Sequence, residues 1–368
     1  MQKSSEDHSE ARENLQQRIR QVDQQLIELI GNRQELVNEL LDAFPQQIGN
    51  RIVTSSQRIE QLLDQSEVPR ISRSQLSREM LGSVMKHISS VCIHSHRPTS
   101  AAYLGPLHSY SHLAALKYFG EATELRPVSS IRAVFESVAR RDLPYGVVPI
   151  ENSTDGRVVD TLGMFLQCDM KVCGEVLLPI HHNLLSRTPR SEITEVHSKP
   201  QALSQCRDWL AKHLPKARLV EISSTAAAAQ LAAETHGVAA VASLEAGRQY
   251  ELDLVDANIE DNPNNVTRFA VLGTDLPEPT GQDKTSILFQ LHHRPGALAD
   301  AMGTFKRHSL NLTWIESFPA PESPSEYIFF VELTGHREQP TVAAALQELG
   351  DSAQRLTLLG SYPKAEST

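Results

Sequence analysis

The sequence predicts a multidomain protein with an all-α N-terminal domain, a central α/β domain and a small α+β domain. Three observations support this fold class. Apolar side chains near the N-terminus recur every three or four positions, the central part alternates strand and helix patterns, and the C-terminal part has a βαββαβ order. The 368 residues are enough for about two or three domains with separate cores. The expected boundaries are residues 10–95, 100–276 and 284–362.

Residues 13–44 have the longest helical pattern. Leu15, Ile19 and Val22 begin a series of apolar residues at spacings of three and four, and Pro45 ends it. Two more helices are expected at residues 57–65 and 74–94. A helix longer than about 25 residues normally packs along a partner helix. This pattern favours a homodimer, with a tetramer as the alternative.

The central and C-terminal parts differ in the order of their elements. In the central part, strands at 101–104, 145–149 and 239–242 alternate with helices at 112–119, 201–210 and 226–234, which is typical of an α/β sheet. A polar linker with prolines begins at Leu276. The expected C-terminal strands are 285–291, 310–318, 327–333 and 355–359, with helices at 296–308 and 340–350. This order predicts a ferredoxin-like domain.

Composition excludes several classes of function. A net charge of -10 argues against a nucleic-acid partner or an anionic membrane surface. No apolar run reaches the ~20 residues of a membrane helix, and no signal-peptide pattern is present, so we expect a cytoplasmic protein. The four cysteines have no CxxC spacing, and the P-loop, dinucleotide and HExxH motifs are absent. We therefore expect no metal and no cofactor.

Five segments of the central domain are rich in amide, hydroxyl and charged side chains. Four lie near expected helix starts, and the fifth precedes an expected strand at 270–272. Such groups suit a substrate that carries carboxylates. Each segment alone has a simpler interpretation as a turn or helix cap, but their succession along one α/β region favours a binding site. The segments are GPLHSYS (105–111), GVVPIENSTDG (146–156), HSKPQAL (197–203), SSTAAAA (223–229) and IEDNPNNVTRF (259–269).

These segments resemble the patterns GPxGT[YF]S, PIENS, HPQAL, STAAA and NNxTRF of prephenate dehydratase. The C-terminal domain resembles an ACT domain, through residues 296–298 (GAL) and 311–317 (NLTWIES). The N-terminal helices resemble the chorismate mutase domain of the bifunctional P-proteins. The resemblance implies a two-lobed central domain like that of periplasmic binding proteins. It also implies an enzyme of phenylalanine biosynthesis that converts prephenate to phenylpyruvate without a cofactor.

The resemblance implies a role for each candidate residue. Thr267 is the expected catalytic residue, because a positioned hydroxyl can donate a hydrogen bond to the departing ring hydroxyl. Arg268 is expected to hold the pyruvyl carboxylate, and a structural ion pair is its alternative role. Neutral donors should hold the ring carboxylate, since a tight cation would stabilise the substrate more than the transition state. The remaining expected binding residues are Ser109, Glu151, Asn152, Ser153, Thr154, Gln201, Ser224 and Thr225.

The ACT resemblance implies feedback inhibition by phenylalanine. Phe318 and His108 are among the positions that depart from the family patterns. Phe318 replaces an arginine of the ACT pattern, which leaves the effector's identity open. His108 replaces a glycine, which predicts that its loop cannot adopt a positive φ angle. The expected effector residues are Gly296, Ala297, Leu298, Asn311, Leu312, Glu316 and Ser317.

The mutase-like helices keep few of the polar residues that the mutase reaction requires. Arg33 and Arg58 match two family arginines, but Gln16 and Phe44 occupy positions of an arginine and a lysine. Losing such groups should abolish most of the rate, so we expect a degenerate mutase domain kept for dimerisation. For the whole protein, the alternatives are an arogenate dehydratase and a non-catalytic sensor of amino acids.

Overall fold

The computed structural model describes residues 2–43, 59, 62, 77–96, 99–274, 276–320 and 323–365. The chain divides into two compact units. The first contains Met1–Pro98 together with Phe119–Thr123, and the second contains Thr99–Tyr118 and Glu124–Thr368. Among the described residues, no helix combines the length and the apolar character needed to cross a bilayer.

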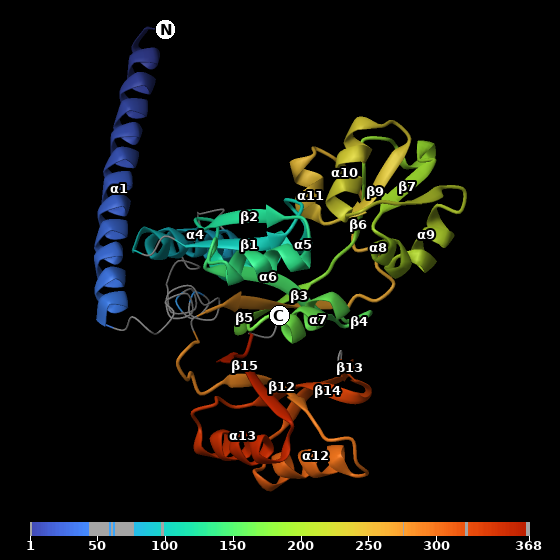
Figure 1. The fold of residues 1–368 in the computed structure, drawn as a ribbon. Helices are drawn as coiled ribbons and strands as arrows, with labels where there is room; N and C mark the ends of the chain where they lie inside the picture. The colour runs from blue at the N-terminus through green and yellow to red at the C-terminus, as the bar shows by residue number, and fades with distance from the viewer. Residues whose placement is uncertain are drawn as a thin grey trace. The chain divides into compact units, whose positions relative to one another are not determined.

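The first unit is helical, as predicted. Helix α1 (Gln2–Ala43) begins earlier than the sequence pattern indicates, and α4 (Arg78–His96) packs near its C-terminal end (Figure 1). Their contact has a small apolar core of Val37, Leu41 and Cys92. Several apolar side chains on the rest of α1 are more than half exposed, among them Leu15 and Ile19. The expected helix at 57–65 lies outside the described residues except for positions 59 and 62.

The central domain has two lobes, each built on its own sheet. The sheet of the first lobe has the order β2-β1-β3-β11-β5, with β4 paired to β3. The chain leaves this lobe after β5 and returns to it in β11, so two crossovers join the lobes. The elements of the first lobe are β1 (Ser100–Leu104), α5 (Tyr110–Phe119), β2 (Glu124–Val128), α6 (Ile131–Ala139), β3 (Tyr145–Asn152), β4 (Gly156–Arg157), α7 (Val159–Gln167), β5 (Lys171–Pro179) and β11 (Val266–Gly273).

The sheet of the second lobe has the order β10-β6-β9-β7-β8. Its central strand β9 has the sequence VAAVA and is buried along its whole length, because helices pack closely against its small side chains. The elements are β6 (Asn183–Ser186), a 3-10 turn (Arg190–Glu192), β7 (Glu195–Ser198), α8 (Pro200–Gln205), α9 (Arg207–His213), β8 (Arg218–Glu221), α10 (Thr225–Glu234), β9 (Val238–Ala242), α11 (Leu244–Gln249) and β10 (Asp253–Asp256).

One predicted helix of the second lobe is divided in the structure. The pattern at 201–210 predicts a single helix, but α8 ends at Gln205 and α9 begins after Cys206. The carboxylate of Asp261 accepts hydrogen bonds from the backbone N–H groups of Asp208 and Trp209. This side chain caps the start of α9 from a distant part of the sequence, which a local pattern does not reveal.

The C-terminal domain has the predicted βαββαβ order. Its sheet has the order β13-β14-β12-β15, and α12 and α13 cover one face (orange and red in Figure 1). Gly296 begins α12 with a φ of 81°, a conformation that favours glycine. The predicted fold class is confirmed for all three domains. The elements are β12 (Asp283–Gln290), α12 (Ala297–Arg307), β13 (Leu312–Ala320), β14 (Ser323–Thr334), α13 (Pro340–Ser352) and β15 (Arg355–Pro363).

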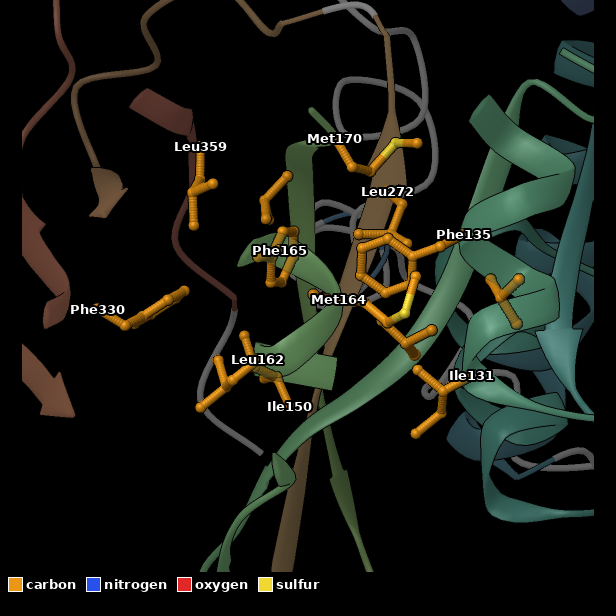
Figure 2. Packing of buried hydrophobic residues seen from close by; sticks show 14 of the residues in the cluster. Ile131, Phe135, Ile150, Leu162, Met164, Phe165, Met170, Leu272, Phe330 and Leu359 are labelled. Atoms are coloured by element: carbon orange, nitrogen blue, oxygen red, sulfur yellow. The ribbon is translucent and has the colours of Figure 1, made fainter. Parts of the chain in front are cut away.

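An apolar core joins the C-terminal domain to the first lobe. Figure 2 shows Phe330 and Leu359 of the C-terminal sheet facing Leu162 and Phe165 of α7. Strand β15 also approaches β5 so closely that a Cβ atom on Gly360 would overlap the backbone of β5. The first lobe and the C-terminal domain therefore share buried surface.

Candidate active site

The ends of β3 and β11 bring together Asn152 and Thr267, residues of two motifs far apart in the sequence. The strands are antiparallel neighbours, and their register places Thr267 opposite Asn152. The Asn152 side-chain amide donates hydrogen bonds to Thr267 Oγ1 and Asn265 Oδ1, both at 2.8 Å. Its Oδ1 accepts hydrogen bonds from the N–H groups of Thr154 and Asp155, which fixes the amide orientation.

This arrangement directs the hydroxyl of Thr267. A hydroxyl has one proton to donate and two lone pairs that accept. Because Thr267 Oγ1 accepts a hydrogen bond from Asn152, its own proton can serve a further partner. The residue is 9% exposed, so a hydrogen bond there is weakly screened by solvent. The pair can therefore present a fixed donor to a small molecule.

The second lobe reaches this pair through Gln205, the last residue of α8. Gln205 Nε2 donates to Asp155 Oδ2 at 2.8 Å, and its Oε1 accepts from Asn265 Nδ2 at 2.9 Å. Gln201, the residue expected to bind substrate, is exposed in the first turn of the same helix. Gln205 lies one turn later, so helical spacing was the available signal for it.

A buried histidine extends the network. His182 Nε2 lies 2.8 Å from Gln205 Oε1, which is an acceptor and so places the ring proton on Nε2. Burial lowers the pKa of His182, so the ring is neutral near pH 7. Glu260 accepts hydrogen bonds from the His182 backbone N–H and from the His181 ring, both at 2.8 Å. Tyr110 donates to the His181 carbonyl at 2.6 Å. The expected site residues include none of His181, His182, Glu260 and Tyr110, although Tyr110 and Glu260 lie in two of the polar segments that the sequence singles out.

Several predicted binding residues have structural hydrogen bonds. Ser224 caps α10 by accepting the Ala227 N–H at 3.0 Å, and Thr225 is buried beside it. Ser109 donates to the Leu104 carbonyl at 3.0 Å. Ser153 Oγ accepts the Val266 N–H at 2.9 Å and joins the ends of β3 and β11. For Ser109 and Ser224, these bonds agree with the capping interpretation.

Arg268 forms buried ion pairs, which is the alternative role expected for it. It is 7% exposed, and its Nε donates to Glu151 Oε2 at 3.0 Å. Its Nη1 lies 2.7 Å from both carboxylate oxygens of Glu332 and 3.4 Å from Glu175 Oε2. Burial acts to lower the pKa of Arg268, but Glu332, Tyr362 and Glu175 together outweigh burial and raise that pKa. Three carboxylates around one guanidinium disfavour a further anion, so the geometry favours the ion-pair role over contact with a substrate carboxylate.

The prediction for the His108 loop is wrong. His108 has a φ of 61° although it replaces a glycine. Its backbone N–H donates to His112 Nδ1 at 3.3 Å, and its ring contacts the His112 ring edge-on. Histidine is one of the residues that tolerate this region comparatively well. The loop therefore keeps the glycine-like turn at some cost in strain.

The expected effector residues lie at the start of α12 and along β13, where they face both sides of the C-terminal sheet. Leu312 packs on the helix side, and the register of β13 shifts between Leu312 and Trp314. After this shift, Glu316 faces the first lobe and pairs with Arg157 of β4. Phe318 is buried, and its ring centroid lies 5.4 Å from the guanidinium carbon of Arg157. The remaining members are Gly296 before α12, Ala297 and the half-exposed Leu298 in its first turn, Asn311 before β13, and exposed Ser317.

The helical unit has a separate, largely apolar cavity of about 220 Å³. Arg33 is the charged side chain among its described lining residues, and its Nη2 donates to Ser89 Oγ at 2.7 Å. Ile59 is buried in the wall. Arg58 lies outside the described residues. The other described lining residues are Leu36, Val37, Leu40, Leu62 and Met85.

Comparisons with known proteins agree with this layout. Residues 101–276 match the family model described as prephenate dehydratase, and residues 285–351 match the ACT domain. A protein of Aquifex aeolicus (strain VF5), described as a bifunctional chorismate mutase/prephenate dehydratase, is 38% identical over 356 residues. The match covers 95% of this chain and 97% of that protein.

Two solved structures extend the comparison. A prephenate dehydratase from Arthrobacter aurescens, in complex with L-Phe, has a TM-score of 0.68 and 32% identity, covering 72% of this chain and 90% of that one. A protein titled a novel type of quorum quenching acylase has a TM-score of 0.66 and 28% identity, covering 72% and 97%. By its sequence, its family matches and its fold, this chain belongs to the prephenate dehydratase family, as an enzyme with a C-terminal ACT domain and the helical N-terminal region of the bifunctional members.

Proposed function

We propose that this enzyme converts prephenate to phenylpyruvate, carbon dioxide and water, with Thr267 as its catalytic residue. The bond between the ring and its carboxylate breaks, and the bonding electrons complete the aromatic ring. The ring hydroxyl departs as hydroxide and takes up a proton. The hydrogen bond of 2.8 Å from Asn152 to Thr267 Oγ1 is the observation that carries this proposal, because it directs the threonine proton toward a partner.

Neutral groups around this pair suit the ring carboxylate. Asn152, Ser153 and Thr154 follow one another at the end of β3, and they carry amide, hydroxyl and backbone N–H donors. Donors of this kind hold the carboxylate without the strong stabilisation that a cation would give to the substrate. In this proposal Arg268 does not contact substrate, and Glu151 acts as its ion-pair partner.

The ACT domain is proposed to bind phenylalanine as a feedback inhibitor. An ACT domain and a structural relative solved in complex with L-Phe support an amino-acid effector. Strand β13 is an edge strand of its sheet and Leu298 is half exposed, so a second subunit can complete the effector site there. A homodimer in the cytoplasm is the proposed state.

For the helical unit, we propose a mutase fold that has lost activity. Chorismate carries two carboxylates, and the described cavity lining supplies one cation among mainly apolar side chains. Measured turnover of chorismate by the full chain at a rate near that of prephenate would contradict this proposal.

One set of assays tests the main proposal. The purified full chain should form phenylpyruvate from prephenate, and excess phenylalanine should slow the reaction. Arogenate is assayed in parallel, because its amine replaces the keto group while the ring chemistry is the same. Faster conversion of arogenate would reassign the substrate, and no aromatic product from either substrate would refute the dehydratase proposal.

A further inference from the structure

A second pair of residues lies directly behind the proposed catalytic pair. Arg268 follows Thr267 on β11, and Glu151 precedes Asn152 on β3. The register pairs Thr267 with Asn152 and Arg268 with Glu151. Successive side chains of a strand point to opposite faces of the sheet. The ion pair between Arg268 and Glu151 therefore holds the same two strand ends from the other face.

The ACT domain supplies the strongest partner of Arg268. Glu332 of β14 is 1% exposed, and both of its oxygens lie 2.7 Å from Arg268 Nη1. Trp314 of β13 stacks on the guanidinium, with 4.6 Å from its carbon to the ring centroid. Both residues belong to strands that pair with each other. Strands β13 and β14 therefore both contact Arg268, which is one residue from Thr267.

Buried charges from both domains meet in one cluster. Lys284 of β12 donates to Glu175 of β5 at 3.0 Å, and Glu175 lies 3.4 Å from Arg268 Nη1. Arg268, Lys284, Glu175 and Glu332 form the interdomain charge cluster, with two cations and two anions. Apolar residues often stabilise a protein interior as well as a buried charge cluster does. The role we assign to this cluster is therefore to specify one geometry. A cluster drawn from both domains specifies how the domains fit together.

Resting on the proposed function, we propose that Arg268 is a positioning residue that couples the ACT domain to Thr267 through Glu332. Effector binding at β13 would shift Trp314 and the paired strand β14. The hydrogen bonds between the Glu332 carboxylate and Arg268 would then lengthen or reorient, and the end of β11 would move with Arg268. The Arg157–Glu316 pair, from β4 to β13, provides a second contact between the same strands and the catalytic end.

The test compares two carboxylates of the ACT domain. Glu332→Gln removes the charge that faces Arg268, whereas Glu348→Gln removes a charge that pairs with Arg307 and His308, away from the cluster. We expect Glu332→Gln to bind phenylalanine with wild-type affinity in calorimetry but to lose inhibition of prephenate turnover by about tenfold or more. Its kcat without effector should change more than its KM. Glu348→Gln should be inhibited like the wild type.

Glu332→Asp guards against misfolding of the first variant, because it keeps the buried charge and withdraws it by one methylene. It should also bind phenylalanine and be inhibited less than the wild type. Inhibition of folded Glu332→Gln and Glu332→Asp by the wild-type factor would overturn the coupling proposal alone. A wild-type enzyme that fails to convert prephenate, or that ignores phenylalanine, would instead overturn the proposed function and the coupling together.

Discussion

Replacing Thr267 by valine should separate activity from stability. Valine keeps the shape of threonine and removes the hydroxyl, while Asn152 Nδ2 keeps its hydrogen bond of 2.8 Å to Asn265. The loss of one partly compensated hydrogen bond should lower the free energy of unfolding by only about 1 kcal/mol. Loss of a positioned proton donor should lower kcat by about 10²–10⁴-fold, which corresponds to about 3–5 kcal/mol of barrier.

The assay follows phenylpyruvate formation at saturating prephenate, and chemical denaturation measures stability. Thr267→Ser keeps a hydroxyl and should retain more activity than Thr267→Val. Thr188→Val is a matched control in the second lobe, because it removes a buried hydroxyl that accepts the Gly237 N–H at 2.9 Å. It should lose stability but keep kcat. A Thr267→Val enzyme with the kcat of the wild type would refute the reasoning about the threonine proton.

Three further changes test other parts of the structure. Gln205→Leu removes the amide that joins the lobes and should lower kcat/KM by about 10–100-fold, measured by steady-state kinetics; an unchanged value would exclude Gln205 from the site. Burial lowers the pKa of His112 from 6.5 to about 4, so its neutral form contributes stability above pH 6.5 that is lost as the pH falls toward 4. Denaturation at pH 7.5 and 5 should show this loss, and His112→Gln should reduce it; equal pH dependence would contradict the assignment. His108→Gly relieves a positive φ and should raise the unfolding free energy by about 1 kcal/mol in the same assay, whereas a decrease would show that the His112 contact outweighs the strain.

Local pattern was sufficient for the fold class and for singling out the segments that contain Asn152 and Thr267. The βαββαβ order and the strand–helix alternation depend on hydrophobic periodicity, which the sequence displays directly. Asn152 is the last residue of β3 and Thr267 the second residue of β11, two strands that the structure pairs. In both segments the polar side chains and the strand pattern lie within a few residues of each other, so the sequence alone reveals them.

Features set by tertiary contacts were not predictable in this way. Gln205 and His182 come to the site because two crossovers bring the second lobe beside the first. Arg268 adjoins Thr267 in sequence, but strand alternation turns its side chain to the opposite face, where Glu332 lies. Because Thr267 and Arg268 are adjacent in sequence, we expected them to share one site, but their side chains lie on opposite faces of the sheet.

The mixed origin of the interdomain charge cluster constrains how this enzyme can be recombined. The dehydratase domain contributes Arg268 and Glu175, and the ACT domain contributes Lys284 and Glu332. A chimera whose foreign regulatory module supplies a counterpart of only one of Lys284 and Glu332 would bury an unmatched charge, at a cost of about 3–5 kcal/mol. A grafted regulatory domain therefore has to carry both the acid and the base of this cluster.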